Sequence, residues 1–238
     1  DSNLTVRTPN NRLLIDQLSF SLEPGNTLLI RGPSGSGKTT LLRAIAGLWP
    51  FCEGDVERPQ DHLLFLAQKP YLPLGSLRQA LYYPQIVSTK EGQLIDREEQ
   101  KEAALASSGS APHNLDDQID TPTTVAPLAT HQDPYARAVL EQVQLGHLID
   151  RLDEVNDWSR ILSLGEQQRL AFGRLMLARP HVAFLDEATS AMDEGLEDAM
   201  YRLIHKHIPD TVLISVGHRS TLVRHHDKQL NLKGNGQW

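Results

Sequence analysis

The sequence is poor in cysteine, in aromatic residues and in long apolar runs. Cys52 is the single cysteine among 238 residues, which excludes a disulfide within the chain and is typical of a reducing compartment. No apolar run approaches the roughly 20 residues that a helix needs to cross a bilayer. With 39% hydrophobic and 22% charged residues, the composition and length suit one large α/β domain. Because Asp1 is not a methionine, we expect the chain to be part of a longer polypeptide.

Basic charge is also scarce, and its distribution argues against one class of partner. The net charge is −7, and residues 86–133 carry −6 of it, with nine acidic and three basic residues. The remainder is nearly neutral and offers no positive field, so we expect no nucleic-acid partner. Residues 86–133 also lack aromatic residues and contain Pro112, Pro122 and Pro127. Such a segment buries too little apolar surface to offset its ordering entropy, so we predict a mostly disordered insertion with at most a short helix over residues 94–106.

Outside that segment, short apolar strands alternate with amphipathic helices. Paired strands are predicted within residues 4–22, around a turn that Pro9, Asn10 and Asn11 mark. Further strands are predicted at residues 27–31, 63–67, 182–186 and 211–216. Helical spacing predicts helices at 39–48, from Pro134 with Asp133 as N-cap and an apolar stripe to Leu152, and from Gly165 toward Pro180. This alternation indicates a largely parallel sheet.

The string GPSGSGKT lies between the predicted strand at 27–31 and the helix that follows. Its glycines allow successive backbone N–H groups to curl around an anion, and the helix N-terminus adds a favourable dipole. Lys38 is suited to reach the β- and γ-phosphates of a nucleotide, and the Thr39 hydroxyl is suited to ligate Mg²⁺. The flanking strand and helix argue against a chance Gly/Ser loop. The predicted phosphate site consists of Gly32, Pro33, Ser34, Gly35, Ser36, Gly37, Lys38, Thr39 and Thr40.

Polar residues follow three of the predicted strands. Asp186 and Glu187 end the string VAFLDE, where Asp186 is suited to the metal shell and Glu187 to polarising an attacking water. An acidic helix N-terminus is the alternative explanation of this pair. His218 follows the strand TVLISVG and is expected to touch the γ-phosphate. Gln68 follows the strand at 63–67, and its neutral amide is suited to ligate Mg²⁺.

A second anion site is predicted at the string LSLGEQQR, residues 162–169. Ser163 and Gly165 lie at the start of a long helix, where free backbone N–H groups and the serine hydroxyl favour phosphate. One chain has little use for two γ-phosphate sites, whereas two chains arranged head to tail would each close the other's nucleotide. We therefore predict a homodimer that depends on ATP.

The other histidines and the cysteine receive structural interpretations. The pairs His205 with His207 and His225 with His226 lack further ligands at metal-binding spacing, so we expect no metal there. Cys52 is expected in a turn, with nothing to make it reactive.

With these motifs in this order, the chain resembles the nucleotide-binding domain of an ATP-binding cassette (ABC) transporter over nearly its whole length except residues 86–133. Further strings resemble subfamily D, which includes peroxisomal fatty-acyl transporters and bacterial relatives with a fused membrane domain. They are LLRAIAGLWP, FLAQKPYLPLGSLRQALYYP, DWSRILSLGEQQRLAFGRLMLARP, FLDEATSAMD and SVGHRSTL. The resemblance implies one P-loop α/β domain, with a mainly parallel core and an antiparallel β subdomain over 1–85 and 181–238, and a helical subdomain over 134–180.

The resemblance also implies roles for individual residues. Glu187, His218 and Lys38 would be catalytic, Thr39 and Gln68 would ligate Mg²⁺, and Asp186 would join the ATP site. Ser163, Gly165, Glu166 and Asp193 would contact the ATP of the partner subunit, with residues 190–193 crossing the interface. Residues 71–77 would receive a helix of a transmembrane domain, fused in the full-length protein, at the cytoplasmic face of a membrane.

The chain departs from the family pattern at three places. No aromatic residue precedes the phosphate loop between Leu4 and Ile15, so Thr8 and Pro9 are expected near the adenine. Leu164 replaces the usual second glycine of the signature. Gly173 lies inside a predicted helix where alanine would be about 1 kcal/mol better, so we expect close packing there.

Three other kinds of ABC protein are less compatible with the sequence. A DNA-repair or chromosome-maintenance ATPase would have a long coiled coil between Gln68 and Ser163, but the 94 residues between them show no sustained heptads. A translation-associated type would join two cassettes in one chain, and this chain has one set of motifs. A non-hydrolysing regulatory cassette is opposed by intact Lys38, Glu187 and His218.

Overall fold

A computed structural model describes residues 2–84 and 133–238 of the chain, and all structural statements concern these residues. The insertion predicted at residues 86–133 lies outside the described residues except for Asp133. The helix predicted at 94–106 also lies outside them.

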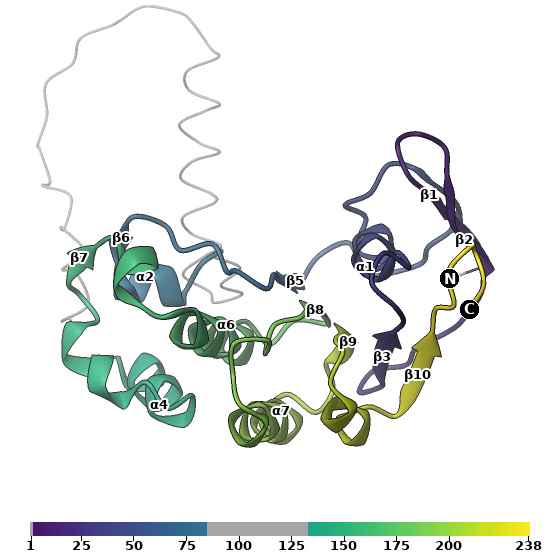
Figure 1. Ribbon diagram of the computed structural model, residues 1–238. Helices are drawn as coiled ribbons and strands as arrows, with labels where there is room; N and C mark the ends of the chain where they lie inside the picture. Colours follow the sequence, from purple (N-terminus) through teal and green to yellow (C-terminus); the bar gives the residue numbers. More distant parts are fainter. Residues whose placement is uncertain (1, 85–132) are drawn as a thin grey trace, which may run out of the picture.

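The described residues contain a central sheet of five parallel strands in the order β10-β3-β9-β8-β5 (Figure 1). The register pairs Leu66 with Leu185 and Asp186 with Val216, so the carboxyl ends of β5, β8 and β9 lie side by side. The predicted parallel core is therefore confirmed. Its strands are β3 (Thr27–Arg31), β5 (Leu63–Leu66), β8 (Val182–Asp186), β9 (Val212–Val216) and β10 (Lys228–Asn231).

The two faces of this sheet belong to different hydrophobic clusters. On β8, Val182 and Phe184 join the cluster that contains α1 (Lys38–Ile45). Ala183 and Leu185 join the cluster that contains α6 (Leu164–Ala178) and α7 (Glu194–His207). Side chains of a strand alternate between faces, so a strand covered on both sides reads as one continuous apolar run. This explains why VAFL carries no polar residue before its two carboxylates.

An antiparallel sheet in the order β2-β1-β4 accompanies the α1 face, as predicted for the β subdomain. Its strands are β1 (Ser2–Arg7), β2 (Leu13–Leu18) and β4 (Cys52–Asp55). Cys52 therefore lies in a strand, and the turn predicted for it is wrong. Its Sγ is 3.2 Å from the carbonyl oxygen of Trp49.

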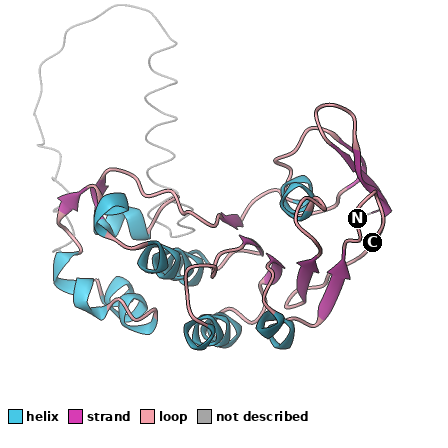
Figure 2. Ribbon diagram, viewed as in Figure 1, coloured by secondary structure: helices cyan, strands magenta, loops and turns pink. Residues whose placement is uncertain are grey.

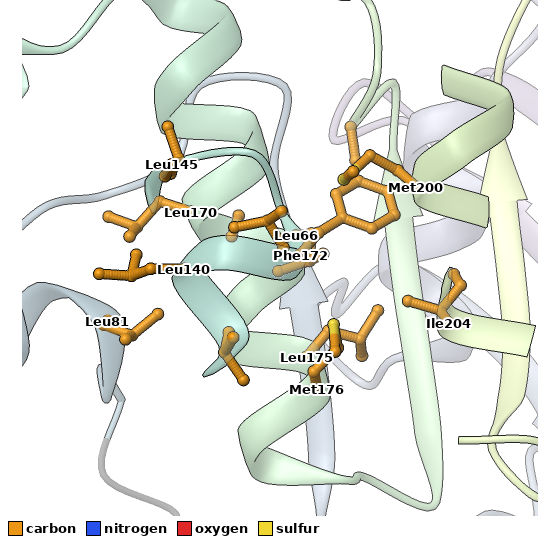
Figure 3. Close-up of a cluster of buried hydrophobic side chains, with 14 of the residues drawn as sticks. Leu66, Leu81, Leu140, Leu145, Leu170, Phe172, Leu175, Met176, Met200 and Ile204 are labelled. Atoms are coloured by element: carbon orange, nitrogen blue, oxygen red, sulfur yellow. The ribbon is translucent and has the colours of Figure 1, made fainter. Parts of the chain in front are cut away.

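Helices gather at the other end of the molecule (Figure 2). Leu81, Leu140, Leu145 and Leu170 converge there, and the same apolar cluster continues through Phe172 to Met200 (Figure 3). A short β6 (Gly75–Ser76) pairs with β7 (Val155–Asn156) beside them. The helices at this end are α2 (Leu77–Leu81), α4 (Pro134–Gln142), η1 (Gly146–Arg151), α5 (Trp158–Ile161) and α6 (Leu164–Ala178). Two further helices, α7 (Glu194–His207) and η2 (Ser220–His225), lie beside the parallel sheet.

Glycine explains how closely these helices approach. A Cβ at Gly173 of α6 would lie 3.0 Å from Leu81 of α2 and 3.0 Å from Val139 of α4. The close packing predicted at this position is confirmed. Because α2 precedes residue 85, the helical lobe draws on both sides of the insertion.

Within residues 2–84 and 133–238, no helix has the length and apolar character needed to cross a membrane.

Two predicted helix ends are wrong. The helix predicted to reach Leu48 ends at Ile45, because Gly47 adopts a positive φ of 79° and Leu48 is 60% exposed. The stripe predicted to run to Leu152 is interrupted after Gln142, where Gln144 has a φ of 60° and a 3₁₀ helix follows. The predicted start of this helix is confirmed, since Asp133 accepts a hydrogen bond from Ala136 N at 3.0 Å.

Candidate functional site

The phosphate-type loop lies between β3 and α1, at the carboxyl edge of the parallel sheet. Gly35 and Gly37 have positive φ values of 79° and 92°, and Gly37 is the N-cap of α1. Lys38 Nζ donates to the carbonyl oxygens of Gly32 and Pro33, each at 2.8 Å. The buried Ser36 hydroxyl has no hydrogen-bond partner among the described residues. A bound anion could accept a hydrogen bond from the unpaired Ser36 hydroxyl and could attract the Lys38 ammonium.

The strand-end residues converge beside this loop. Asp186 Oδ1 accepts a hydrogen bond from the Thr39 hydroxyl at 3.0 Å. Burial raises the pKa of Asp186, partly opposed by the Thr39 hydrogen bond and by nearby Arg43. Burial lowers the pKa of Lys38, while Glu187 and Asp186 act to raise it. The fold therefore brings Lys38, Asp186 and Glu187 close enough for their charges to interact.

Glu187 and His218 form a contact pair across two adjacent strand ends. His218 Nε2 is 2.9 Å from Glu187 Oε1. Glu187 has a φ of 51°, and its backbone N–H donates to Val216 O at 3.0 Å, two residues before His218. A positive φ is unusual for a glutamate, and strained residues of this kind cluster at functional sites. The hydrogen bond to β9 therefore holds a potential general base in a fixed direction.

The oxygen donors at this edge fit a magnesium ion. Mg²⁺ binds carboxylate, hydroxyl and amide oxygens, and it keeps several waters. The Thr39 hydroxyl and the Asp186 carboxylate are already in contact, and Gln68 follows β5 at the same sheet edge. Gln68 is exposed, so its amide is accessible at this edge.

Gln168 of α6 is a site residue that sequence reasoning missed. Its side chain is fully buried, and its Nε2 donates to Gln68 O at 2.7 Å and to Ser190 Oγ at 3.0 Å. Its Oε1 accepts from Ala191 N at 2.9 Å. One amide thereby joins the signature helix to the loop of Gln68 and to the loop at 190–193. These hydrogen bonds could not be predicted from the residues around Gln168, because its partners lie 22 to 100 residues away in the sequence.

The signature residues lie at the start of α6. Ser163 is its N-cap: its hydroxyl accepts from Glu166 N at 3.2 Å, and Glu166 Oε1 accepts from Ser163 N at 3.0 Å. This capping box occupies both side chains. A Cβ at Gly165 would lie 3.0 Å from Ala191 O, so the signature touches the loop at 190–193. Asp193 at the end of that loop caps α7 through Leu196 N at 2.8 Å.

The predicted adenine neighbours line a separate hollow. Thr8 and Pro9 border a cavity of about 200 Å³ together with Phe51. Arg7 N donates to Phe51 O at 2.9 Å, which brings this aromatic residue beside the β1–β2 turn. Phe51 follows the phosphate loop in sequence, so the absence of aromatic residues before that loop does not exclude an aromatic side chain here.

The histidine pair His225 and His226 contacts neighbouring side chains and backbone of the core. His226 Nε2 lies 2.8 Å from Ser215 Oγ, and its Nδ1 lies 2.7 Å from Leu222 O. His225 lies 3.0 Å from Asp198 and stacks on Tyr201.

The chain is similar in sequence to known proteins over nearly its whole length. The family model described as "ABC transporter" matches residues 15–190. An uncharacterized ABC transporter ATP-binding protein of Haemophilus influenzae is 46% identical over 99% of this chain and 33% of its own length. ABC transporter D family member 2, chloroplastic, of Arabidopsis thaliana is 42% identical over 96% of this chain and 33% of its own length. Human ATP-binding cassette sub-family D member 3 is 33% identical over 98% of this chain and 30% of its own length. The chain thus spans about a third of the length of these relatives.

Proposed function

This chain belongs to the ABC transporter family, with relatives in its subfamily D, and from that premise we propose that it binds and hydrolyses ATP as one half of a nucleotide-closed dimer. The observation that carries the proposal is the contact of Glu187 with His218 beside the lysine, threonine and aspartate of the phosphate loop.

The phosphate loop would hold the nucleotide through its backbone N–H groups and Lys38. The Lys38 ammonium would exchange the carbonyl oxygens of Gly32 and Pro33 for phosphate oxygens. Thr39, Asp186 and Gln68 would hold Mg²⁺, which supplies charge neutralisation on the phosphates when bound. The buried Ser36 hydroxyl gains the partner that it lacks among the described residues.

Glu187 would act as the residue that orients and polarises the attacking water. A positioned general base contributes about 10²–10⁴ to a rate. His218 contacts its carboxylate at 2.9 Å and is suited to report the γ-phosphate. The Lys38 ammonium would stabilise the negative charge that develops on the γ-phosphate in the transition state.

A second copy of the chain would complete each site. The signature at Ser163 and Gly165 lies on the helical lobe at the start of α6, while the phosphate loop belongs to the parallel core. Two copies placed head to tail would each bring Ser163, Gly165, Glu166 and Asp193 to the other's ATP. Gln168 links this surface to Gln68 and would carry the state of one site to the other.

The relatives' remaining length supports a membrane partner. They are about three times as long as this chain, and the Haemophilus and Arabidopsis relatives are named as ABC transporter proteins. Tyr71 and Leu74 are 63% and 77% exposed, so the stretch at 71–77 presents an apolar surface suited to a helix of a transmembrane domain. We propose that closure and reopening of the dimer drive transport through that domain at the cytoplasmic face of a membrane. None of the names of the relatives described above refers to DNA, so they lend no support to a DNA-maintenance role.

The first test is ATP-dependent dimerisation measured by light scattering. In Mg-ATP, Glu187→Gln should accumulate as a dimer while its ATPase rate falls about 10²–10⁴-fold. Wild type should cycle back to monomer as ATP is consumed. The amide is isosteric with the carboxylate, so binding is retained while the base is lost.

A matched control is Glu141→Gln, the same change at an exposed position of α4. It should behave as wild type. Dimers that form equally without nucleotide, or a Glu187→Gln variant that binds ATP and stays monomeric, would contradict the proposal.

A further inference from the structure

Two histidines and an aspartate meet at the edge of the sheet opposite the phosphate loop. Asp61, His62 and His181 each offer a ligand atom, and these atoms lie within 4.8 Å of one another. His62 directly precedes β5 and His181 directly precedes β8. Strands rise about 3.3 Å per residue, so this cluster lies roughly 16 Å from Asp186 at the other end of β8. It is therefore distinct from the nucleotide site.

The backbone holds the two histidines side by side. The parallel register pairs Leu63 with Val182, and His181 N donates to His62 O at 2.8 Å just before that pair. His181 O in turn accepts from Val212 N at 2.9 Å, which ties the cluster to β9. The imidazole rings are 5.2 Å apart in an edge-to-face arrangement. His62 has a φ of 55°, a conformation that is uncommon outside glycine.

The third ligand and the surroundings favour a cation. Asp61 Oδ2 is 3.7 Å from His62 Nε2. Asp61 and His181 also line a cavity of about 370 Å³ whose floor is apolar, with Phe184 and Ile214. The charged groups that line this cavity are three carboxylates and one guanidinium: Glu57, Asp61, Asp210 and Arg58. A net negative rim draws a divalent ion toward the histidines.

We propose that Asp61, His62 and His181 bind a borderline divalent metal ion of the Zn²⁺ class. Imidazole and carboxylate together suit zinc, with bonds of about 2.0–2.2 Å. Tetrahedral ligands at that range lie about 3.4 Å apart, so the three side chains need to close by little more than about 1 Å. Asp61 is exposed and the histidines are at most partly buried, which permits the rotation. Water would complete the coordination.

Bound metal would connect the loop before β5 to the start of β8. These strands carry Gln68 and Asp186 at their other ends, so the ion would stabilise the scaffold of the nucleotide site without touching it. A ligand that binds the folded state alone stabilises it by RT ln(1 + L/Kd), where L is the free ligand concentration, so the melting temperature rises with ligand concentration.

The test is a zinc titration of the chain, prepared without a histidine tag and stripped with a chelator. Isothermal titration calorimetry should reveal one saturable Zn²⁺ site in wild type. His181→Ala should weaken that binding by more than the roughly tenfold that loss of an outer-shell partner costs. Asp61→Asn, a change on an exposed side chain, should weaken it as well.

His207→Ala is the matched control, since His207 lies on α7 and outside the cluster. Its zinc affinity should equal that of wild type, and zinc should raise the melting temperature of both proteins but not that of His181→Ala. Circular dichroism checks the fold of each variant. Absence of saturable binding in wild type would overturn the proposal, as would equal binding by wild type, His181→Ala and Asp61→Asn.

Discussion

At the scale of single residues, polar side chains in this protein act by joining segments that are distant in sequence. Gln168 is fully buried and connects α6 to Gln68 O, Ser190 Oγ and Ala191 N. Each hydrogen bond adds little net free energy, but an apolar side chain here would remove all three at once and leave part-buried groups unpaired. Its importance therefore lies in what its loss would leave behind.

We expect Gln168→Leu to lower the free energy of unfolding by about 1–3 kcal/mol, because Ala191 N and Gln68 O would lose a buried partner. Urea unfolding measures the change. The ATPase rate should also fall, since both loops that Gln168 holds border the proposed site.

Gln142→Leu at an exposed position of α4 is the control, and its stability should stay within about 0.5 kcal/mol of wild type. Equal stability of the two variants would show that the Gln168 junction is dispensable.

At the scale of elements, α6 is the helix on which the two lobes depend. It packs against α2 and α4 in the helical lobe and against α7 beside the sheet. Its N-terminus carries the signature with a capping box, and its middle carries Gly173, where α2 and α4 approach. The glycine gives up helix propensity, and the neighbouring helices occupy the space that a methyl group would need.

The same substitution should therefore have opposite effects on two helices. Gly173→Ala should destabilise the protein by about 1 kcal/mol, because overpacking against Leu81 and Val139 exceeds the propensity gain. Gly195→Ala at an exposed position of α7 should stabilise it by up to about 1 kcal/mol, since a Cβ there meets Asp193 at an ordinary 3.4 Å. Thermal or urea unfolding of both variants tests this, and a stabilising Gly173→Ala would contradict it.

At the scale of the whole molecule, one sheet supports two hydrophobic clusters and a buried polar relay. Tyr201 of α7 lies 3.0 Å from Ser215 of β9, which lies 2.8 Å from His226. His226 in turn contacts Leu222 O of η2 at 2.7 Å. A neutral imidazole fits here, donating from Nδ1 and accepting at Nε2. Burial lowers the pKa of His226 to about 4, and the nearby His205 and His225 act in the same direction.

This shift makes folding stability fall in mild acid. The histidine of the unfolded chain titrates near 6.5, so between about pH 6.5 and 4 the unfolded chain binds the proton that the folded protein refuses. The stabilisation that comes from the neutral His226 is fully present above pH 6.5. On acidification to pH 4, the free energy of unfolding falls by about 3 kcal/mol.

We expect His226→Gln to be less stable than wild type at pH 7.5 but to lose less stability on acidification to pH 4.5. Urea unfolding across this range measures both slopes. His207→Gln should keep the slope of wild type. Identical slopes for wild type and His226→Gln would remove this residue from the acid response.

Features that depend on nearby residues could be predicted from the sequence. The strands at 27–31 and 182–186 and the start of α4 are confirmed, because apolar runs, turn residues and caps act over a few positions. The predicted end of α1 is wrong, because Leu48 continues the apolar spacing in the sequence whereas the positive φ of Gly47 ends the helix before it. The proximity of Thr39 to Asp186 followed from the rule that parallel strands end at a common edge.

The family, the phosphate loop and the parallel core could thus be predicted from short motifs and apolar runs, because each depends on contiguous residues. The fold was needed to show that Glu187 contacts His218, that Gln168 joins three segments and that His62 lies beside His181. These pairs are separated by long stretches of chain, and their distances depend on sheet register and helix packing. Such quantities arise from all the contacts of the fold at once, so no local pattern encodes them.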